Sequence, residues 1–278
     1  MTTESDYRAV KAINISSLKY LRHSPSMYQY RLQHAQESDS MGFGTLAHLL
    51  TLEPHRFERD VAVWTSRTEA GAMSPRRGKA WDAFVAEHAG KTLVTENEYL
   101  DASALSAAVR ATPAAMRYLV DGAAEVPLYW EWPVGPCKGR LDFVTRVDGK
   151  TVVVGLKTSR DCRPIPFGSQ AFKLGYHLQW AWYHDGYEAA HGEFPRMVEI
   201  VVDSSEPHHV VVYDIPDEVL EYGRQEYQAL LETLQHCRET GEWPGPARGE
   251  VTFTLPTWVW RQDENDITSL GLEESDDE

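Results

Sequence analysis

The sequence predicts an α/β protein with a central mixed β-sheet flanked by helices and an α-helical N-terminal portion. Two valine-rich runs, at 139–144 and 151–158, flank Asp148-Gly149-Lys150, a composition typical of a β-hairpin and its turn. Further strand patterns precede and follow this hairpin, and a long amphipathic helix is predicted at 218–240. Strands interleaved with helices favour a sheet covered by helices.

The first part of the chain is predicted to be helical. Asn14 or Ser16 is suited to cap a short helix ending near Leu21, which Ser24-Pro25 breaks. A second helix is predicted at 27–34. A third, at 42–54, begins with glycines and stops at a proline.

His48 is the notable polar side chain of the third helix. From that helix alone it is best interpreted as a core histidine whose ring bonds a neighbouring carbonyl.

A basic loop stands out in the next segment. Residues 56–66 are predicted to form a strand, and residues 67–79 then gather basic side chains among Gly, Ser and Pro. This loop is either a solvated surface or a contact for phosphate groups. Its basic residues are Arg67, Arg76, Arg77 and Lys79. Helices are predicted at 81–89 and at 96–119, the second interrupted near Pro113.

The second half of the chain supplies most of the sheet. A strand at 125–132 precedes the hairpin, and a loop is predicted at 161–168. An aromatic-rich helix follows at 171–190, with Gln179 and Tyr183 four residues apart on one face. Two strands, at 198–203 and 209–213, come before the long helix.

Length and composition indicate a single domain over residues 1–262 with an acidic tail at 263–278. The formal net charge of −15 argues against a protein that coats nucleic acid nonspecifically, although acids that hold metal ions also contribute to it. The three cysteines lack a CxxC pair, so no disulfide framework, zinc site or iron-sulfur cluster is indicated. Without a signal pattern or an apolar run of about 18 residues, a cytoplasmic protein without membrane contact is expected.

The hairpin carries the chemistry. Side chains alternate along a strand, so Val153, residue 155 and Lys157 are expected on one face, where Asp142 of the preceding strand can meet Lys157. A carboxylate beside an acid-x-lysine pattern is how a metal-dependent nuclease holds a divalent cation next to a lysine that orients water. Position 155, where the second acid is expected, is glycine.

Several short motifs, taken in order, resemble the RecE-like exonucleases (exodeoxyribonuclease VIII, nuclease portion), of the PD-(D/E)XK superfamily that includes phage lambda exonuclease. The resemblance covers most of the chain. Its motifs are Ile15-Ser16-Ser17-Leu18-Lys19 with Ser24-Pro25, Phe43-Gly44-Thr45-Leu46-Ala47-His48 through Leu52-Glu53-Pro54, Arg77-Gly78-Lys79-Ala80-Trp81, Lys138-Gly139-Arg140-Leu141-Asp142, Leu156-Lys157-Thr158 and Tyr176-His177-Leu178-Gln179.

The resemblance implies a metal site. It assigns His48, Asp142, Glu125 and the Leu156 carbonyl as ligands of Mg²⁺ or Mn²⁺, with Asp142 and Glu125 also counted among the catalytic residues. Lys157 would orient the attacking water and stabilise charge on the phosphate.

The resemblance also implies how the protein meets its substrate. Gln179 and Tyr183 would hold the DNA strand, and the DNA-binding residues are expected to include Arg140, Arg76, Arg77 and Lys79. The implied activity is removal of nucleotides from duplex DNA ends, 5′ to 3′, leaving single strands for recombination or for an annealing protein. A ring-shaped homo-oligomer is implied as well.

Gly155 allows three interpretations. A natural or engineered substitution has silenced an otherwise intact site, an acid has migrated from Asp161 or Glu131, or the chain is an inactive DNA-binding or recombination-partner module on the same fold. Because His48, Glu125, Asp142 and Lys157 all persist, the silenced site is favoured. Losing one charge-stabilising group typically costs about 10²–10³ in rate.

Overall fold

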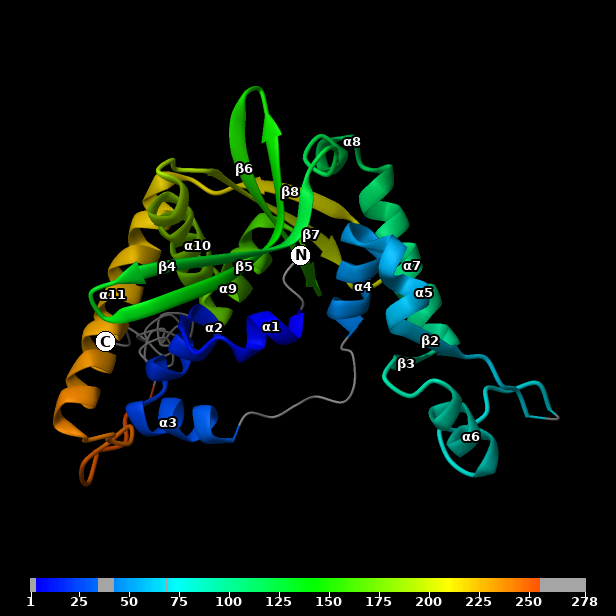
Figure 1. Ribbon diagram of the computed structural model, residues 1–278, viewed down its shortest axis with the longest axis horizontal. Coiled ribbons are helices and arrows are strands. Elements are labelled where there is room, and N and C mark those ends of the chain that lie inside the picture. The colour runs from blue at the N-terminus through cyan, green and yellow to red at the C-terminus, as the bar shows by residue number, and fades with distance from the viewer. Residues whose placement is uncertain (1–3, 35–42, 69, 256–278) are drawn as a thin grey trace, which may run out of the picture.

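The computed structural model describes residues 4–34, 43–68 and 70–255. Six strands form one mixed sheet in the order β1-β5-β6-β7-β8, with β4 also paired to β5 (Figure 1). The pairs β1–β5 and β6–β7 are parallel, and the others are antiparallel. The predicted fold class is thereby confirmed. The strands are β1 (Ile13–Asn14), β4 (Ala123–Trp132), β5 (Gly135–Val147), β6 (Lys150–Ser159), β7 (Arg196–Asp203) and β8 (Val210–Asp214).

The predicted hairpin is formed by β5 and β6. Val147 pairs with Lys150, so the loop consists of Asp148 and Gly149 alone. Both residues have positive φ angles, 53° and 77°, which is the backbone of a type I′ turn and favours an Asp-Gly sequence.

Helices cover both faces of the sheet. On one face, Val153 and Val201 pack in a cluster with residues of α10 and α11, including Trp182 and Leu234. On the other face, the neighbouring side chains of the same strands, such as Val154, pack with α4 and α7. The alternation predicted for β6 is therefore confirmed. The helices that flank this sheet are α2 (Ile15–Leu18), α3 (Pro25–Gln33), α4 (Phe43–Leu52), α7 (Glu96–Ala111), α8 (Pro113–Met116), α9 (Pro164–Leu174), α10 (Tyr176–His191) and α11 (Asp217–Thr240).

The remaining elements are short. A second, two-stranded parallel sheet joins β2 (Val61–Trp64) to β3 (Thr92–Thr95), and α6 (Lys79–Glu87) lies between them in the sequence. Figure 1 shows α6 set apart from the main sheet. The others are α1 (Glu4–Ala9), the 3₁₀ helices η1 (Lys19–Arg22) and η2 (Pro54–Arg56), and α5 (Phe57–Asp60).

Three local predictions were wrong. Residues 56–60 are helical, and the strand there begins only at Val61. The segment 161–168 is not all loop, because Pro164 starts α9 and proline suits the first turn of a helix. The helix predicted at 171–190 is two helices, separated by Gly175 with a φ angle of 67°.

Two further expectations from the sequence concern the acidic tail and membrane spans. The predicted tail at 263–278 is outside the described residues. Among the residues that are described, no helix is both long and apolar enough to cross a membrane.

Candidate metal-binding active site

The site lies at a fork in the sheet, where β1 and β6 pair with different stretches of β5. β6 pairs with residues 143–147 of β5, whereas the two-residue strand β1 pairs with residues 137 and 138. Asp142 lies between these two pairings, and its carboxylate accepts a hydrogen bond from the Leu156 backbone N–H at 3.0 Å. The Asp142 side chain thus accepts the hydrogen bond of a backbone N–H that has no strand partner at this point. This contact fixes the position of the carboxylate in the lining of a groove.

Lys157 is held against Asp142. Its Nζ atom donates to Asp142 Oδ2 at 3.0 Å, and both side chains are 16% exposed. Burial alone would lower the pKa of Lys157, but the carboxylates of Asp142 and Glu199 raise it above its ordinary value. Burial likewise favours neutral Asp142, yet the Lys157 cation and the hydrogen bond from the Leu156 N–H lower the pKa of this carboxyl. The pair is therefore ionised, a lysinium beside a carboxylate.

His48 reaches the same point from α4. Its Nε2 atom contacts the carbonyl oxygen of Leu156, on β6. Burial lowers the pKa of His48, with the Lys157 cation adding to that effect. A neutral imidazole is the form that binds metal ions. Both interpretations of His48 made from the sequence meet here, because it bonds a carbonyl and that carbonyl belongs to the predicted metal site.

The space that a side chain at position 155 would fill is occupied by a carboxylate from another strand. Gly155 pairs with Glu199 of β7, and a Cβ atom at position 155 would lie 2.4 Å from both carboxylate oxygens of Glu199. Glu199 is 1% exposed. Its Oε2 atom accepts a hydrogen bond from Trp180 Nε1 at 2.5 Å, and its Oε1 atom is 3.6 Å from Lys157 Nζ. Glu199 is not among the residues predicted from the sequence, where its one signal is a lone acid within the apolar run 197–202.

The residues predicted to hold DNA line one groove together with Asp142 and Lys157. Gln179 Nε2 donates to the Tyr183 hydroxyl at 3.0 Å, so these two side chains do meet on one face of α10. Glu125, which lies between the pairs Ala124–Phe143 and Val126–Leu141 of the β4–β5 register, forms an ion pair with Arg140 at 2.7 Å. Its φ angle of 52° is unusual for a residue other than glycine and marks a local distortion of β4 beside the site.

The basic loop does not join this groove. Arg76, Arg77 and Lys79 are absent from its lining, and Arg76 forms an ion pair with Glu98. Lys79 begins α6, which Figure 1 shows set apart from the main sheet, and Arg76 and Arg77 directly precede it in the sequence.

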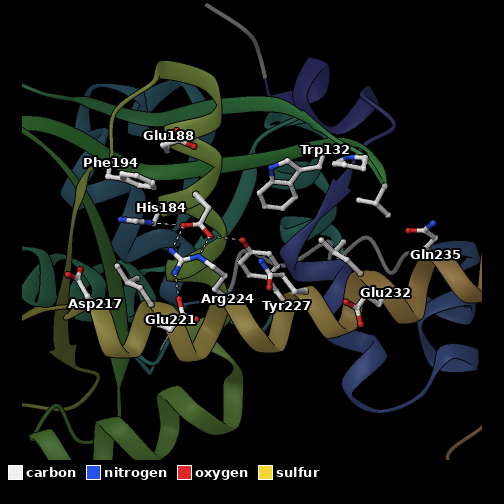
Figure 2. A pocket seen from close by; sticks show the side chains of 16 residues that line it. Trp132, His184, Glu188, Phe194, Asp217, Glu221, Arg224, Tyr227, Glu232 and Gln235 are labelled. Carbon is white, nitrogen blue, oxygen red and sulfur yellow. Dashed lines mark hydrogen bonds and ion pairs between the residues drawn. The ribbon is translucent and has the colours of Figure 1, made fainter.

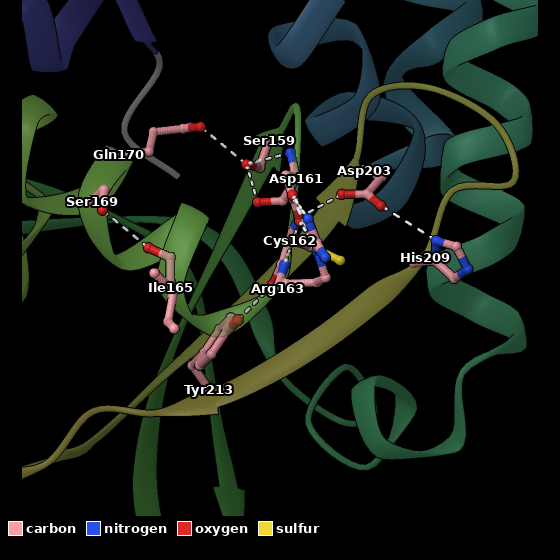
Figure 3. A network of polar contacts seen from close by, with 10 residues as sticks. All are labelled: Ser159, Asp161, Cys162, Arg163, Ile165, Ser169, Gln170, Asp203, His209 and Tyr213. Atoms are coloured by element: carbon pink, nitrogen blue, oxygen red, sulfur yellow. Dashed lines mark hydrogen bonds and ion pairs between the residues drawn. The ribbon is translucent and has the colours of Figure 1, made fainter. Parts of the chain in front are cut away.

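Neither migrated acid considered from the sequence lies at the site. Figure 3 shows Asp161 directed to Arg163, whose guanidinium donates to it at 2.6 Å. Asp161 is thus committed to the loop before α9. Glu131 is exposed near the far end of β4, opposite Pro136. Both candidates are wrong, because neither Asp161 nor Glu131 lines the groove that contains Asp142 and Lys157.

A second cavity, of about 940 Å³, lies between α10, α11 and the end of β4 (Figure 2). Its polar core is the pair Asp185 and Arg224, joined at 2.6 Å, with the Tyr227 hydroxyl donating to Asp185. These groups satisfy one another and join the two helices, so their evident role is structural.

The donor set at the fork suits a divalent cation. Among the described residues, no group of three or more His, Cys, Asp or Glu side chains is placed so that it could hold a metal ion. The fork does bring together the His48 imidazole, the Asp142 carboxylate and the Leu156 carbonyl, and beneath them Glu199 Oε1 is buried without a hydrogen-bond partner. Hard oxygen donors with a neutral imidazole fit Mg²⁺ or Mn²⁺.

The sheet that forks at Asp142 beside the strand of Lys157 has the arrangement that the resemblance to PD-(D/E)XK nucleases implies. The chain belongs to the family described as "PDDEXK-like domain of unknown function (DUF3799)", whose model matches residues 14–252.

A solved structure agrees with this fold. A protein named "Putative exonuclease", from Eubacterium rectale, aligns with a TM-score of 0.59 and 13% identity over 94% of this chain and 98% of its own. The structure of SSO0001 aligns with a TM-score of only 0.30 and 15% identity, over 77% and 84% of the two chains. No curated protein matches the chain.

Proposed function

We propose that this protein is a divalent-metal-dependent nuclease that removes nucleotides from duplex DNA ends in the 5′ to 3′ direction, as RecE-like exonucleases do. The observation that carries the proposal is the ionised pair of Lys157 and Asp142, 3.0 Å apart at the floor of a groove. The name of the Eubacterium rectale protein agrees with an exonuclease activity.

His48, Asp142 and the Leu156 carbonyl would hold the metal, with Glu125 as a further acid at the groove. A bound Mg²⁺ supplies charge neutralisation and a more acidic water for attack on phosphorus. Lys157 contributes a fixed ammonium group that orients this water and offsets the charge developing on the phosphate. Asp142 keeps that ammonium in place through their hydrogen bond.

The groove also offers polar groups for the DNA strand. Gln179 and Tyr183 form a linked pair on α10, and Arg140 lies on the same strand as Asp142. We assign these side chains to phosphate and sugar contacts near the cleaved bond. Arg76, Arg77 and Lys79 would contact duplex DNA farther away, if α6 faces it.

Two expectations about partners accompany the proposal: a homo-oligomeric ring around the DNA and a single-strand annealing protein that receives the product. The third expectation is a cytoplasmic location.

The test is digestion of linear duplex DNA with Mg²⁺ or Mn²⁺. Labels at the 5′ or the 3′ end separate the two polarities, and covalently closed circular DNA controls for the need of an end. Asp142→Asn is expected to lower the rate by at least about 10²-fold. A chain that leaves every linear substrate intact with either metal contradicts the proposal.

One observation favours a second candidate, a DNA-binding or recombination-partner module that does not cut. The motif position 155 carries no acid. Metal-dependent binding to DNA ends, with no product at any enzyme concentration, would identify this function instead.

A further inference from the structure

We propose that Glu199, from the neighbouring strand β7, supplies the metal-binding carboxylate that the superfamily's sequence pattern places at position 155. This inference rests on the proposed nuclease function, because it concerns the same metal site. It explains why glycine stands at the motif position in an otherwise intact site.

The first support is steric. A Cβ atom on residue 155 would lie 2.4 Å from both oxygens of the Glu199 carboxylate and 2.6 Å from its Cδ atom. Carbon and oxygen atoms do not approach so closely without bonding. In this arrangement the Glu199 carboxylate occupies the space that the first atom of any side chain at position 155 would need, so a larger residue there would require the carboxylate to move.

The second support is topological. β6 and β7 are parallel neighbours with Gly155 directly paired to Glu199. Paired residues on adjacent parallel strands direct their side chains to the same face, about 4.8 Å apart. The extra methylene of glutamate, compared with aspartate, helps its carboxylate to extend across that spacing toward β6.

The third support is chemical. Trp180 holds one oxygen of Glu199 at 2.5 Å, whereas the other oxygen, Oε1, is buried without a hydrogen-bond partner. The ammonium of Lys157 lies 3.6 Å from Oε1, which is within ion-pair range and too long for a strong hydrogen bond. A buried oxygen left in this state costs free energy, and a metal ion bound beside Lys157 would satisfy it.

Together these observations explain the glycine at position 155 without loss of the motif acid. The motif acid is displaced by one strand, neither lost nor moved to Asp161 or Glu131. The same three groups, two carboxylates and a lysine, remain within one cluster.

The test measures Mn²⁺ binding to the full-length protein by calorimetry and by electron paramagnetic resonance, without DNA. Glu199→Gln keeps the size of the side chain and an acceptor for Trp180 but removes the charge. We expect it to weaken Mn²⁺ binding by at least about 10-fold. The matched control is Glu226→Gln, which removes an acid paired with His177 and Arg22, away from Asp142 and Lys157, and should leave the affinity unchanged.

A carboxylate exchange provides the second measurement. Glu199→Ala alone should lose Mn²⁺ affinity, and Gly155→Asp alone should be destabilised, because two carboxylates would compete for one space. The double variant Gly155→Asp with Glu199→Ala restores the ordinary motif and should regain most of the affinity. This rescue separates a metal ligand from a residue needed only for folding.

The outcomes are distinct. Unchanged Mn²⁺ affinity in Glu199→Gln, or no rescue in a folded double variant, overturns the assignment of Glu199. If Mn²⁺ binding depends on Glu199 as expected but no DNA is cleaved, the nuclease proposal fails while the metal ligand stands. If the unaltered chain binds no Mn²⁺, both proposals fall.

Discussion

Lys157 is the residue on which the charge balance of the site depends. It is the cation shared by Asp142 and Glu199, at 3.0 and 3.6 Å, and all three side chains are largely buried. Burial raises the pKa of Glu199, and the nearby Asp142 adds to this effect, whereas Lys157 opposes it. Without the lysine, two buried carboxylates would face each other with no compensating charge.

We therefore predict that Lys157→Met destabilises the metal-free protein by about 3–5 kcal/mol at pH 8, the cost of leaving buried charges unpaired. The loss should shrink at pH 5, because protonation of a carboxyl whose pKa is already raised removes the repulsion. Urea denaturation at the two pH values measures this. An equal loss at both would mean that lost packing, rather than charge, causes the destabilisation.

At this scale the sequence predicted much of the site. Asp142, Lys157 and His48 could be found because each lies in a local motif, and the structure gathers them around Leu156. Glu199 could not, because its role depends on pairing between strands about 40 residues apart in the chain, and no local pattern encodes that register. Its only trace was an acid among the apolar residues 197–202.

Between α9 and α10, Gly175 has a left-handed backbone, with φ of 67°. It ends one helix and begins the next, which carries Gln179 and Tyr183. A Cβ atom here would lie 3.0 Å from Arg22 Nη1 and from Leu178 Cδ1. The sequence predicted one continuous helix here, because helical periodicity alone does not reveal a single residue with positive φ.

Gly175→Ala is predicted to destabilise the protein by about 1–2 kcal/mol from backbone strain, plus a contribution from the close contacts. Gly192→Ala is the matched control, since Gly192 has φ of 75° and open space around its Cβ position. Thermal denaturation of both variants should show the larger loss for Gly175. Equal losses would contradict a role for contacts with Arg22 and Leu178.

A second buried acid, Asp185, joins helices α10 and α11. Asp185 of α10 accepts hydrogen bonds from Arg224 and Tyr227 of α11 and from His184 (Figure 2). Burial favours the neutral acid, but these bonds lower the pKa of Asp185 to about 2. A lowered folded-state pKa contributes stability above the unfolded value of about 3.9, and this is lost as pH falls toward about 2.

Asp185→Asn should therefore cost about 2 kcal/mol at pH 7, corresponding to the pKa shift of nearly two units. The difference from the unaltered protein should disappear as the pH falls from 4 to 2. Denaturation across this pH range tests it, with Asp101→Asn, at an exposed position of α7, as the control. A constant difference down to pH 2 would show that charge on Asp185 does not matter.

For the whole molecule, net charge and groove composition determine how DNA can approach. The chain carries a formal charge of −15, and most cations of the groove are already engaged. Arg56 pairs with Glu53 and Asp60, and Lys138 donates to the carbonyls of Tyr7 and Val10. The metal-free groove therefore offers little positive potential to a phosphate backbone.

A divalent cation at the fork should reverse this balance, because it adds two positive charges beside Asp142. We predict that Ca²⁺, which binds oxygen ligands, raises the affinity for a duplex DNA end at least about 10-fold at constant ionic strength, about 1.4 kcal/mol. Fluorescence anisotropy of an end-labelled duplex measures it. Asp142→Asn should abolish the increase. If Ca²⁺ leaves the affinity unchanged, DNA is bound by another basic surface, and the loop of Arg76, Arg77 and Lys79 becomes the surface to mutate.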